Sequence, residues 1–105
     1  MVKTLATLAE YQETIKTEGK LVVVDFTASW CPPCQMIGPK FVAMAEEHGD
    51  SVVMVKVDVD DNADAAQEAG IQAMPTFKFF KGGNEVHQIR GADEAGLRAK
   101  INELK

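Results

Sequence analysis

Residues 21–34 read LVVVDFTASWCPPC, and this stretch decides the fold that we expect. It opens with four apolar residues in a row, 21–24, which is typical of a strand buried on both faces in the middle of a sheet. It ends in two cysteines, Cys31 and Cys34, with two prolines between them. Proline fits the first turn of a helix, because it has no N–H to leave unbonded there. The stretch therefore predicts a central strand that runs into a helix, with the cysteine pair at the helix start.

Outward from this stretch, strand and helix patterns alternate along the chain. The predicted strands are 2–6, 21–28, 52–59, and a hairpin of 76–80 and 85–90 around a turn at 81–84. The first predicted helix runs from a Thr7–Glu10 capping box to Gly19, and the second covers 34–48 with a kink at Pro39. The third covers 62–69 and is closed by Gly70, and a last helix is capped by Asp93. Crossover helices bring strands in parallel, whereas the hairpin must be antiparallel. We expect one α/β domain, residues 1–105, with a mixed five-stranded central sheet flanked by four helices in the order β-α-β-α-β-α-β-β-α.

Composition limits the binding partners and the cellular compartment that we expect for the chain. The 105 residues are 46% hydrophobic and 26% charged, with a net charge of -5, which is ordinary for a globular domain. An acidic surface repels phosphate backbones and anionic lipids, so we expect neither nucleic acid nor a membrane as a partner. Residues 1–16 contain Glu10, Gln12 and Glu13 where a signal peptide needs an apolar stretch. We therefore expect a cytoplasmic protein.

The two cysteines are the only ones in the chain. A bond between them closes a loop too short to stabilise the fold much, so the pair serves either reactivity or metal binding. A helix N-terminus stabilises a thiolate through its free N–H groups and its dipole. Cys31 at that terminus is the expected exposed attacking thiol, and Cys34, one turn inside, is the shielded resolving thiol. Since Pro32 and Pro33 have no N–H, Cys34 is the only motif residue able to donate to the Cys31 sulfur.

Two metal-binding alternatives compete with a redox pair. Zinc requires four ligands, and the only histidines are His48 and His87, far from the cysteines in sequence and in different predicted elements. A copper carrier with such a pair would follow a βαββαβ order, which this chain does not show. We therefore predict no metal.

Seven spaced segments carry a resemblance to a known family: VVVDF at 22–26, WCPPC at 30–34, MIGP at 36–39, VDVDD at 57–61, MPTF at 74–77, GA at 91–92 and INEL at 101–104. Together they resemble the thioredoxins, most closely the animal type, along nearly the whole chain. The resemblance implies the thioredoxin fold and a general protein-disulfide reductase. In that reaction Cys31 attacks a substrate disulfide, and Cys34 then resolves the mixed disulfide. No bound cofactor is implied. A separate thioredoxin reductase would restore the dithiol, and the chain has no GxGxxG nucleotide fingerprint of its own.

The resemblance also implies a role for Asp25. It matches the family's buried aspartate below the resolving cysteine, where it would accept the proton of Cys34. The alternative is a carboxylate at a strand end that faces solvent, but the apolar run before it favours burial. Lys56 matches a lysine that some bacterial thioredoxins place near this aspartate, and a solvated strand lysine is equally compatible with the sequence.

Further matching positions are implied to form the substrate groove. Pro75 matches a cis-proline beside the disulfide, and Met74 would offer its backbone to the substrate chain. Trp30 matches a surface tryptophan that flanks the site, a role compatible with ordinary packing. Gly91 and Ala92 match the loop that completes the groove. Disulfide-containing proteins would bind there through shallow, mostly backbone contacts, and we expect a monomer.

Three departures from the family pattern leave questions open. Pro32 stands where the family usually has glycine, which leaves the redox potential open and keeps an oxidant or isomerase as an alternative. Gln35 replaces the usual basic residue. The extra cysteines of animal thioredoxins are absent, so no regulatory oxidation of such cysteines is expected. A binding module with incidental thiols is the alternative outside enzymes, and the joint presence of Cys31, Cys34, Asp25 and Pro75 argues against it.

Overall fold

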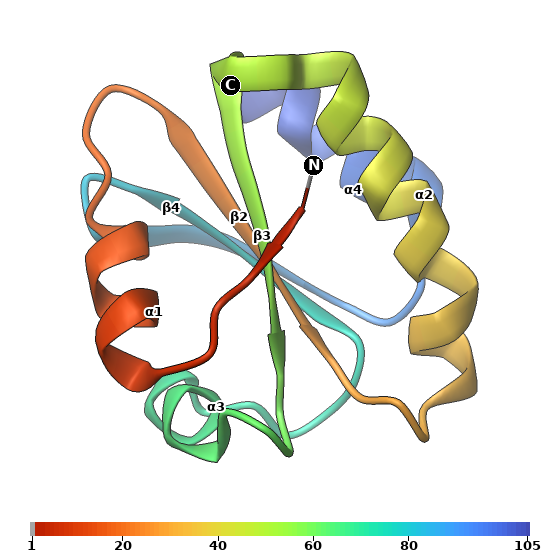
Figure 1. Ribbon diagram of the computed structural model, residues 1–105. Helices are drawn as coiled ribbons and strands as arrows, with labels where there is room; N and C mark the ends of the chain where they lie inside the picture. Colours follow the sequence, from red (N-terminus) through yellow and green to blue (C-terminus); the bar gives the residue numbers. More distant parts are fainter. Residues whose placement is uncertain (1) are drawn as a thin grey trace.

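The computed structural model describes residues 2–105, and its elements follow the predicted order (Figure 1). They are β1 Lys3–Thr4, α1 Leu8–Ile15, β2 Leu21–Thr27, α2 Pro32–His48, a 3₁₀ turn at Gly49–Ser51, β3 Val52–Asp58, α3 Ala63–Ala69, β4 Thr76–Lys81, β5 Asn84–Arg90 and α4 Glu94–Leu104. Five strands and four helices confirm the predicted architecture. Within the described residues, no helix is long and apolar enough to cross a membrane.

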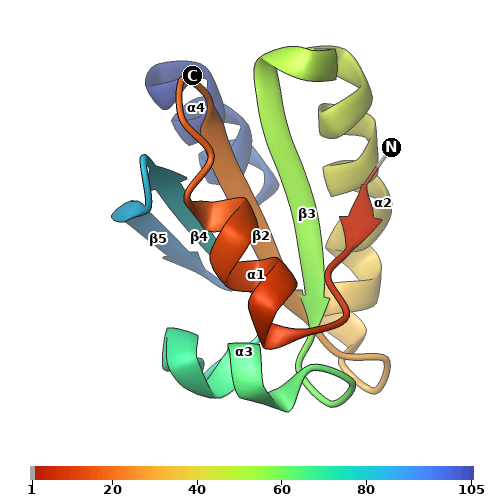
Figure 2. The same ribbon diagram turned by 60° about the vertical axis from the view of Figure 1, so that its left-hand side comes forward.

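The sheet has the order β1-β3-β2-β4-β5, with β2 in the centre. Strand β2 pairs in parallel with β3 and antiparallel with β4, and its residues 21–26 are all buried. Val23 points into a core formed with α2 and α4, whereas Val22 and Val24 point into a second core formed with α1 and α3. Figure 2 shows these helix pairs on opposite faces of the sheet. The apolar run at 21–24 therefore does mark a strand covered on both faces.

The direction of β4 corrects one expectation. We expected helical crossovers to lead into parallel strands, yet β4 runs antiparallel to β2. Helix α3 has seven residues and spans only about 10 Å, whereas a strand as long as β3 spans about 23 Å. The helix lies at the end of the sheet where β3 finishes, so the chain enters β4 from that same end (Figure 2).

Several element boundaries also differ from the prediction. Strand β1 is only two residues long. Helix α1 ends at Ile15 rather than at Gly19, and the Lys16 N–H donates to the Glu13 carbonyl of its last turn. The hairpin turn consists of Gly82 and Gly83 alone, and both adopt positive φ, as tight hairpin turns require. Helix α2 starts at Pro32 rather than at Cys34, and Pro39 lies inside it, as predicted. The caps at Thr7 and Asp93 are confirmed, since their side chains accept N–H bonds from Glu10 and Gly96.

Candidate active site

The cysteine pair lies at the start of α2, at the end of the loop that follows β2. Cys31 is the N-cap of the helix, and its sulfur forms a disulfide with Cys34, with 5.3 Å between the two Cα atoms. The backbone N–H of Cys34 donates to the Cys31 sulfur at 3.3 Å. This confirms that, with two prolines between the cysteines, Cys34 provides the motif's own donor to that sulfur.

The expected exposure of Cys31 is wrong for the disulfide form. Cys31 is 5% exposed and Cys34 is 2% exposed. The bond turns the Cys31 sulfur toward Cys34, and both residues join Ala28 in a small buried cluster against which Met74 packs. The prediction considered the helix terminus alone, whereas the surrounding loops cover it. Cys31 remains the more exposed of the two cysteines.

Trp30 lies on the surface beside the pair, as predicted, with 63% of its area exposed. Its indole N–H donates to Oδ2 of Asp60 at 2.8 Å, so the ring is tethered to the loop after β3. Asp60 is a site neighbour that the sequence alone does not single out. It lies in an acidic run, and only the folded loop shows which carboxylate meets the indole.

The two remaining predicted segments of the groove meet each other in the structure. The Met74–Pro75 peptide bond is cis, as predicted. The Gly91 N–H donates to the Pro75 carbonyl at 2.8 Å, which joins the 91–92 loop to the proline. Pro75 is buried, Met74 is half-buried and Ala92 is exposed. Through Met74, which also packs on the cysteine cluster, the structure brings these segments to the disulfide.

Asp25 is buried in β2, at 3% exposure, which rules out the solvent-facing alternative. Among residues 2–105 no protein group donates a hydrogen bond to its Oδ1 atom. Burial raises the pKa of Asp25 to about 7, and the positive charge of Lys56 opposes that rise. Lys56 is the direct neighbour of Asp25 in the parallel β2–β3 pairing, although no ion pair joins the two side chains in the described structure.

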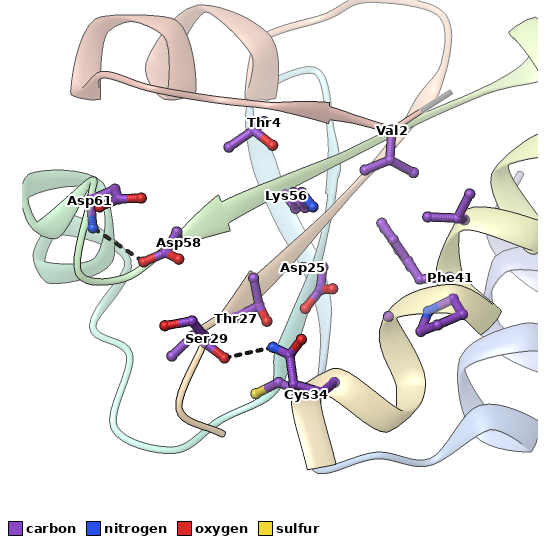
Figure 3. A pocket seen from close by; sticks show the side chains of 15 residues that line it. Val2, Thr4, Asp25, Thr27, Ser29, Cys34, Phe41, Lys56, Asp58 and Asp61 are labelled. Atoms are coloured by element: carbon purple, nitrogen blue, oxygen red, sulfur yellow. Dashed lines mark hydrogen bonds between the residues drawn. The ribbon is translucent and has the colours of Figure 1, made fainter. Parts of the chain in front are cut away.

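A cavity of about 530 Å³ connects this carboxylate with the resolving cysteine. Its lining includes Asp25, Cys34, Lys56 and Gln35. Figure 3 shows the side chains of Asp25, Lys56 and Cys34 facing this space. Asp25 and Cys34 therefore face the same cavity.

Gln35 is the second residue whose role the sequence does not show. Its side-chain N–H donates to the carbonyl of Ala28 at 2.9 Å. In the sequence it stands out only as a departure from the family's basic residue. A long amide directly after the second cysteine is the available signal, but its acceptor is set by the folded loop.

Among residues 2–105, no group of three or more His, Cys, Asp or Glu side chains is placed to hold a metal ion.

Comparison with known proteins agrees with this geometry. The family model described as thioredoxin matches residues 2–103. The chain belongs to the thioredoxin family. It is 54% identical to a thioredoxin of Geodia cydonium over the full length of both chains, and 47% identical to one of Homo sapiens over 99% of both. The structure of Fasciola hepatica thioredoxin superposes with a TM-score of 0.94 at 46% identity, covering 99% of this chain and all of the other.

Membership of the family settles the class of reaction. Thioredoxins are protein disulfide oxidoreductases, and here the cysteines of the WCPPC motif form a disulfide. The chain is therefore a protein disulfide oxidoreductase whose redox group is the cysteine pair itself, with no prosthetic group.

Proposed function

We propose that this protein is a general reductase of protein disulfides, with Cys31 as the attacking thiol. The observation that carries the proposal is the place of Cys31 at the N-cap of α2, with the Cys34 N–H directed at its sulfur. A thiolate at this position is stabilised by the helix dipole and by that hydrogen bond, which favours attack by Cys31.

The reaction proceeds in two exchanges. The Cys31 thiolate attacks one sulfur of the substrate disulfide, so a mixed disulfide forms and the other substrate sulfur leaves as a thiolate. Cys34 then loses its proton and attacks the Cys31 sulfur. The mixed disulfide breaks, the second substrate thiolate leaves, and the Cys31–Cys34 bond closes. The substrate gains two electrons, and the protein dithiol supplies them.

Asp25 is proposed as the proton acceptor for Cys34 in the second exchange. Both side chains line the same cavity, and the carboxylate Oδ1 receives no protein hydrogen bond within residues 2–105 that would hold it in one state. With its pKa raised to about 7, Asp25 can take up a proton and release it again near neutral pH. Lys56 contributes a positive charge that limits this rise and supports the ionised form.

Substrate is proposed to lie across the surface formed by Trp30, Met74, Pro75, Gly91 and Ala92. In support, Trp30 precedes Cys31 in the chain, Met74 packs on the cysteine cluster, and the Gly91 N–H donates to the Pro75 carbonyl. An extended substrate chain would bond the backbone of Met74, which suits many different sequences. Pro32 and Pro33 are proposed to support the site by stiffening the first turn of α2, and Pro39 by kinking the helix.

We propose the partners and the cellular compartment from the family membership and from the thiol chemistry of the site. A separate thioredoxin reductase would return the pair to the dithiol, so the protein would carry electrons between that enzyme and protein substrates as a monomer. Both cysteines of the sequence belong to the site, as suits a protein of the reducing cytoplasm.

Two measurements test the proposal. Reduction of insulin by dithiothreitol should accelerate in the presence of the protein, and no acceleration would reject the reductase function. Equilibration with glutathione decides between reductase and oxidant. The disulfide of a reductase resists millimolar reduced glutathione, whereas that of an oxidant is reduced by it.

A further inference from the structure

Gln35 is bonded to both ends of the loop segment that carries the attacking cysteine. Its side-chain N–H donates to the Ala28 carbonyl at 2.9 Å. Its backbone N–H donates to the Cys31 carbonyl at 3.1 Å. The two acceptors belong to the first and last residues of the segment 28–31, so a single residue of α2 bonds both of its ends.

The Ala28 carbonyl depends strongly on this side chain. Ala28 is fully buried, and its carbonyl also accepts the Cys31 N–H, but at 3.3 Å. That distance lies beyond the usual range of an N–H···O bond, whereas the Gln35 bond has the most common length. Without the amide, the carbonyl would keep only the longer bond, and the Ala28 end of the segment would be held less tightly against the helix.

The bonds of Gln35 involve no sulfur atom, unlike the disulfide and the bond from the Cys34 N–H. The disulfide disappears when the pair is reduced, and the bond from the Cys34 N–H ends on the Cys31 sulfur itself. We propose that Gln35 is a positioning residue that holds residues 28–31 against α2 in the dithiol form, and so keeps the Cys31 sulfur within reach of Cys34. This inference rests on thiol–disulfide exchange by the Cys31–Cys34 pair, and it holds whether the pair reduces or oxidises its substrates.

A positioning role has a measurable consequence for the redox equilibrium. The protein dithiol reacts with oxidised glutathione to give the protein disulfide and two molecules of reduced glutathione. The equilibrium constant rises with the effective concentration of one protein thiol at the other. When residues 28–31 are loosened, this effective concentration falls and the disulfide becomes less favourable. Loss of the Gln35 side-chain bond should therefore lower the constant by at least about threefold.

The experiment compares Gln35→Met with the reverse exchange at the next position, Met36→Gln. Methionine keeps an unbranched side chain of similar length and removes the donor. Met36 is 69% exposed, so its replacement swaps the same two residue types in the opposite sense and does not affect residues 28–31. Each full-length protein is equilibrated with glutathione mixtures at pH 7, trapped with acid and alkylated, and the oxidised fraction is measured by mass spectrometry. Denaturant melts of the oxidised forms establish that each variant is folded.

The proposal expects the constant of Gln35→Met to fall at least about threefold while Met36→Gln stays within about twofold of the parent. A smaller fall or a rise in Gln35→Met overturns it, and so does an equal fall in Met36→Gln. If Gln35→Met does not fold, Gln35→Glu replaces it under the same criteria, because it also lacks the donor. The glutathione equilibrium does not use a protein substrate, so a failure of insulin reduction leaves this test intact.

Discussion

Two regions of the central sheet bury a charged side chain, one beneath the disulfide and one in the β4–β5 hairpin. Asp25 in β2 is 3% exposed, and no protein donor within residues 2–105 reaches its Oδ1. Lys78 in β4 is 7% exposed, and its Nζ atom lies 2.7 Å from Oε1 of Glu85. The two are almost neighbours, since Lys78 pairs with Val24 across the β2–β4 ladder.

The difference fits the proposed role of Asp25 in proton transfer. Burial of a charge without a partner is costly, and the pKa of Asp25 rises to about 7 because burial disfavours its carboxylate. The Lys78 ammonium keeps its charge balanced by Glu85, which suits a structural role. Changes under the disulfide should therefore alter activity and can even stabilise the fold. Changes in the hairpin should alter stability alone.

The largest expected effects come from the cysteines. Cys31→Ser should abolish insulin reduction, because the attacking thiolate is absent. Cys34→Ser should keep the first exchange but accumulate mixed disulfides, since no thiol is left to release the substrate. Turnover assays and non-reducing mass spectrometry of the adducts measure both outcomes. Faster alkylation of Cys34 than of Cys31 at neutral pH in the reduced protein would reverse the assignment.

Asp25→Asn should give the next largest effect, a loss of about 10²-fold in turnover where the second exchange limits the rate. The amide cannot accept the Cys34 proton, while the size and place of the side chain are kept. Glu85→Gln is the matched control, because it makes the same chemical change in the hairpin, and it should leave turnover unchanged. An Asp25→Asn variant as fast as the parent would remove the proton-relay role.

The contrast between these regions also shows what sequence can predict. The apolar run at 21–24 is a local pattern. It correctly predicted the central strand and, with it, the burial of Asp25. The cysteines at the start of α2 and the cis bond at Pro75 likewise followed from motifs. These features are encoded within a few neighbouring residues, or in segments that match the family.

Features that depend on distant segments were not predicted. The direction of β4 follows from where α3 lies at the end of the sheet, which no periodicity records. Lys78 looks like an alternating surface residue of a hairpin, and only the folded sheet buries it beside Glu85. The cover over Cys31 and the bond from Gln35 to Ala28 depend in the same way on loops that close over the helix start.

The pH dependence of stability sharpens the contrast further. The pKa of Asp25 is about 7 in the folded chain and near its ordinary value of 3.8 when unfolded. Between these values the folded state binds more protons, so the contribution of Asp25 to stability falls as pH rises from about 4 to about 7. Asp25→Asn removes this fall. In the oxidised form, where the cysteines do not titrate, the variant should be no more stable than the parent near pH 4.

At pH 8 the same variant should be more stable than the parent by about 1–3 kcal/mol, a range that allows for the buried amide's own imperfect bonding. Urea melts of both oxidised proteins at several pH values measure the difference in unfolding free energy. A difference that does not change with pH would show that Asp25 titrates normally.

The smallest expected effect is in the hairpin. Glu85→Gln keeps a group that can accept a hydrogen bond from Lys78 but removes the charge that balances the buried ammonium. Because the Glu85 side chain is 40% exposed, solvent screens the pair, and we expect a loss of about 1 kcal/mol in the unfolding free energy. Glu103→Gln is the control. It breaks the exposed Lys100–Glu103 pair and should cost less than about 0.5 kcal/mol. Urea melts at pH 7 compare the two. Equal losses would mean that burial of Lys78 does not strengthen its ion pair, and that the hairpin differs from the disulfide region only in having a partner for its charge.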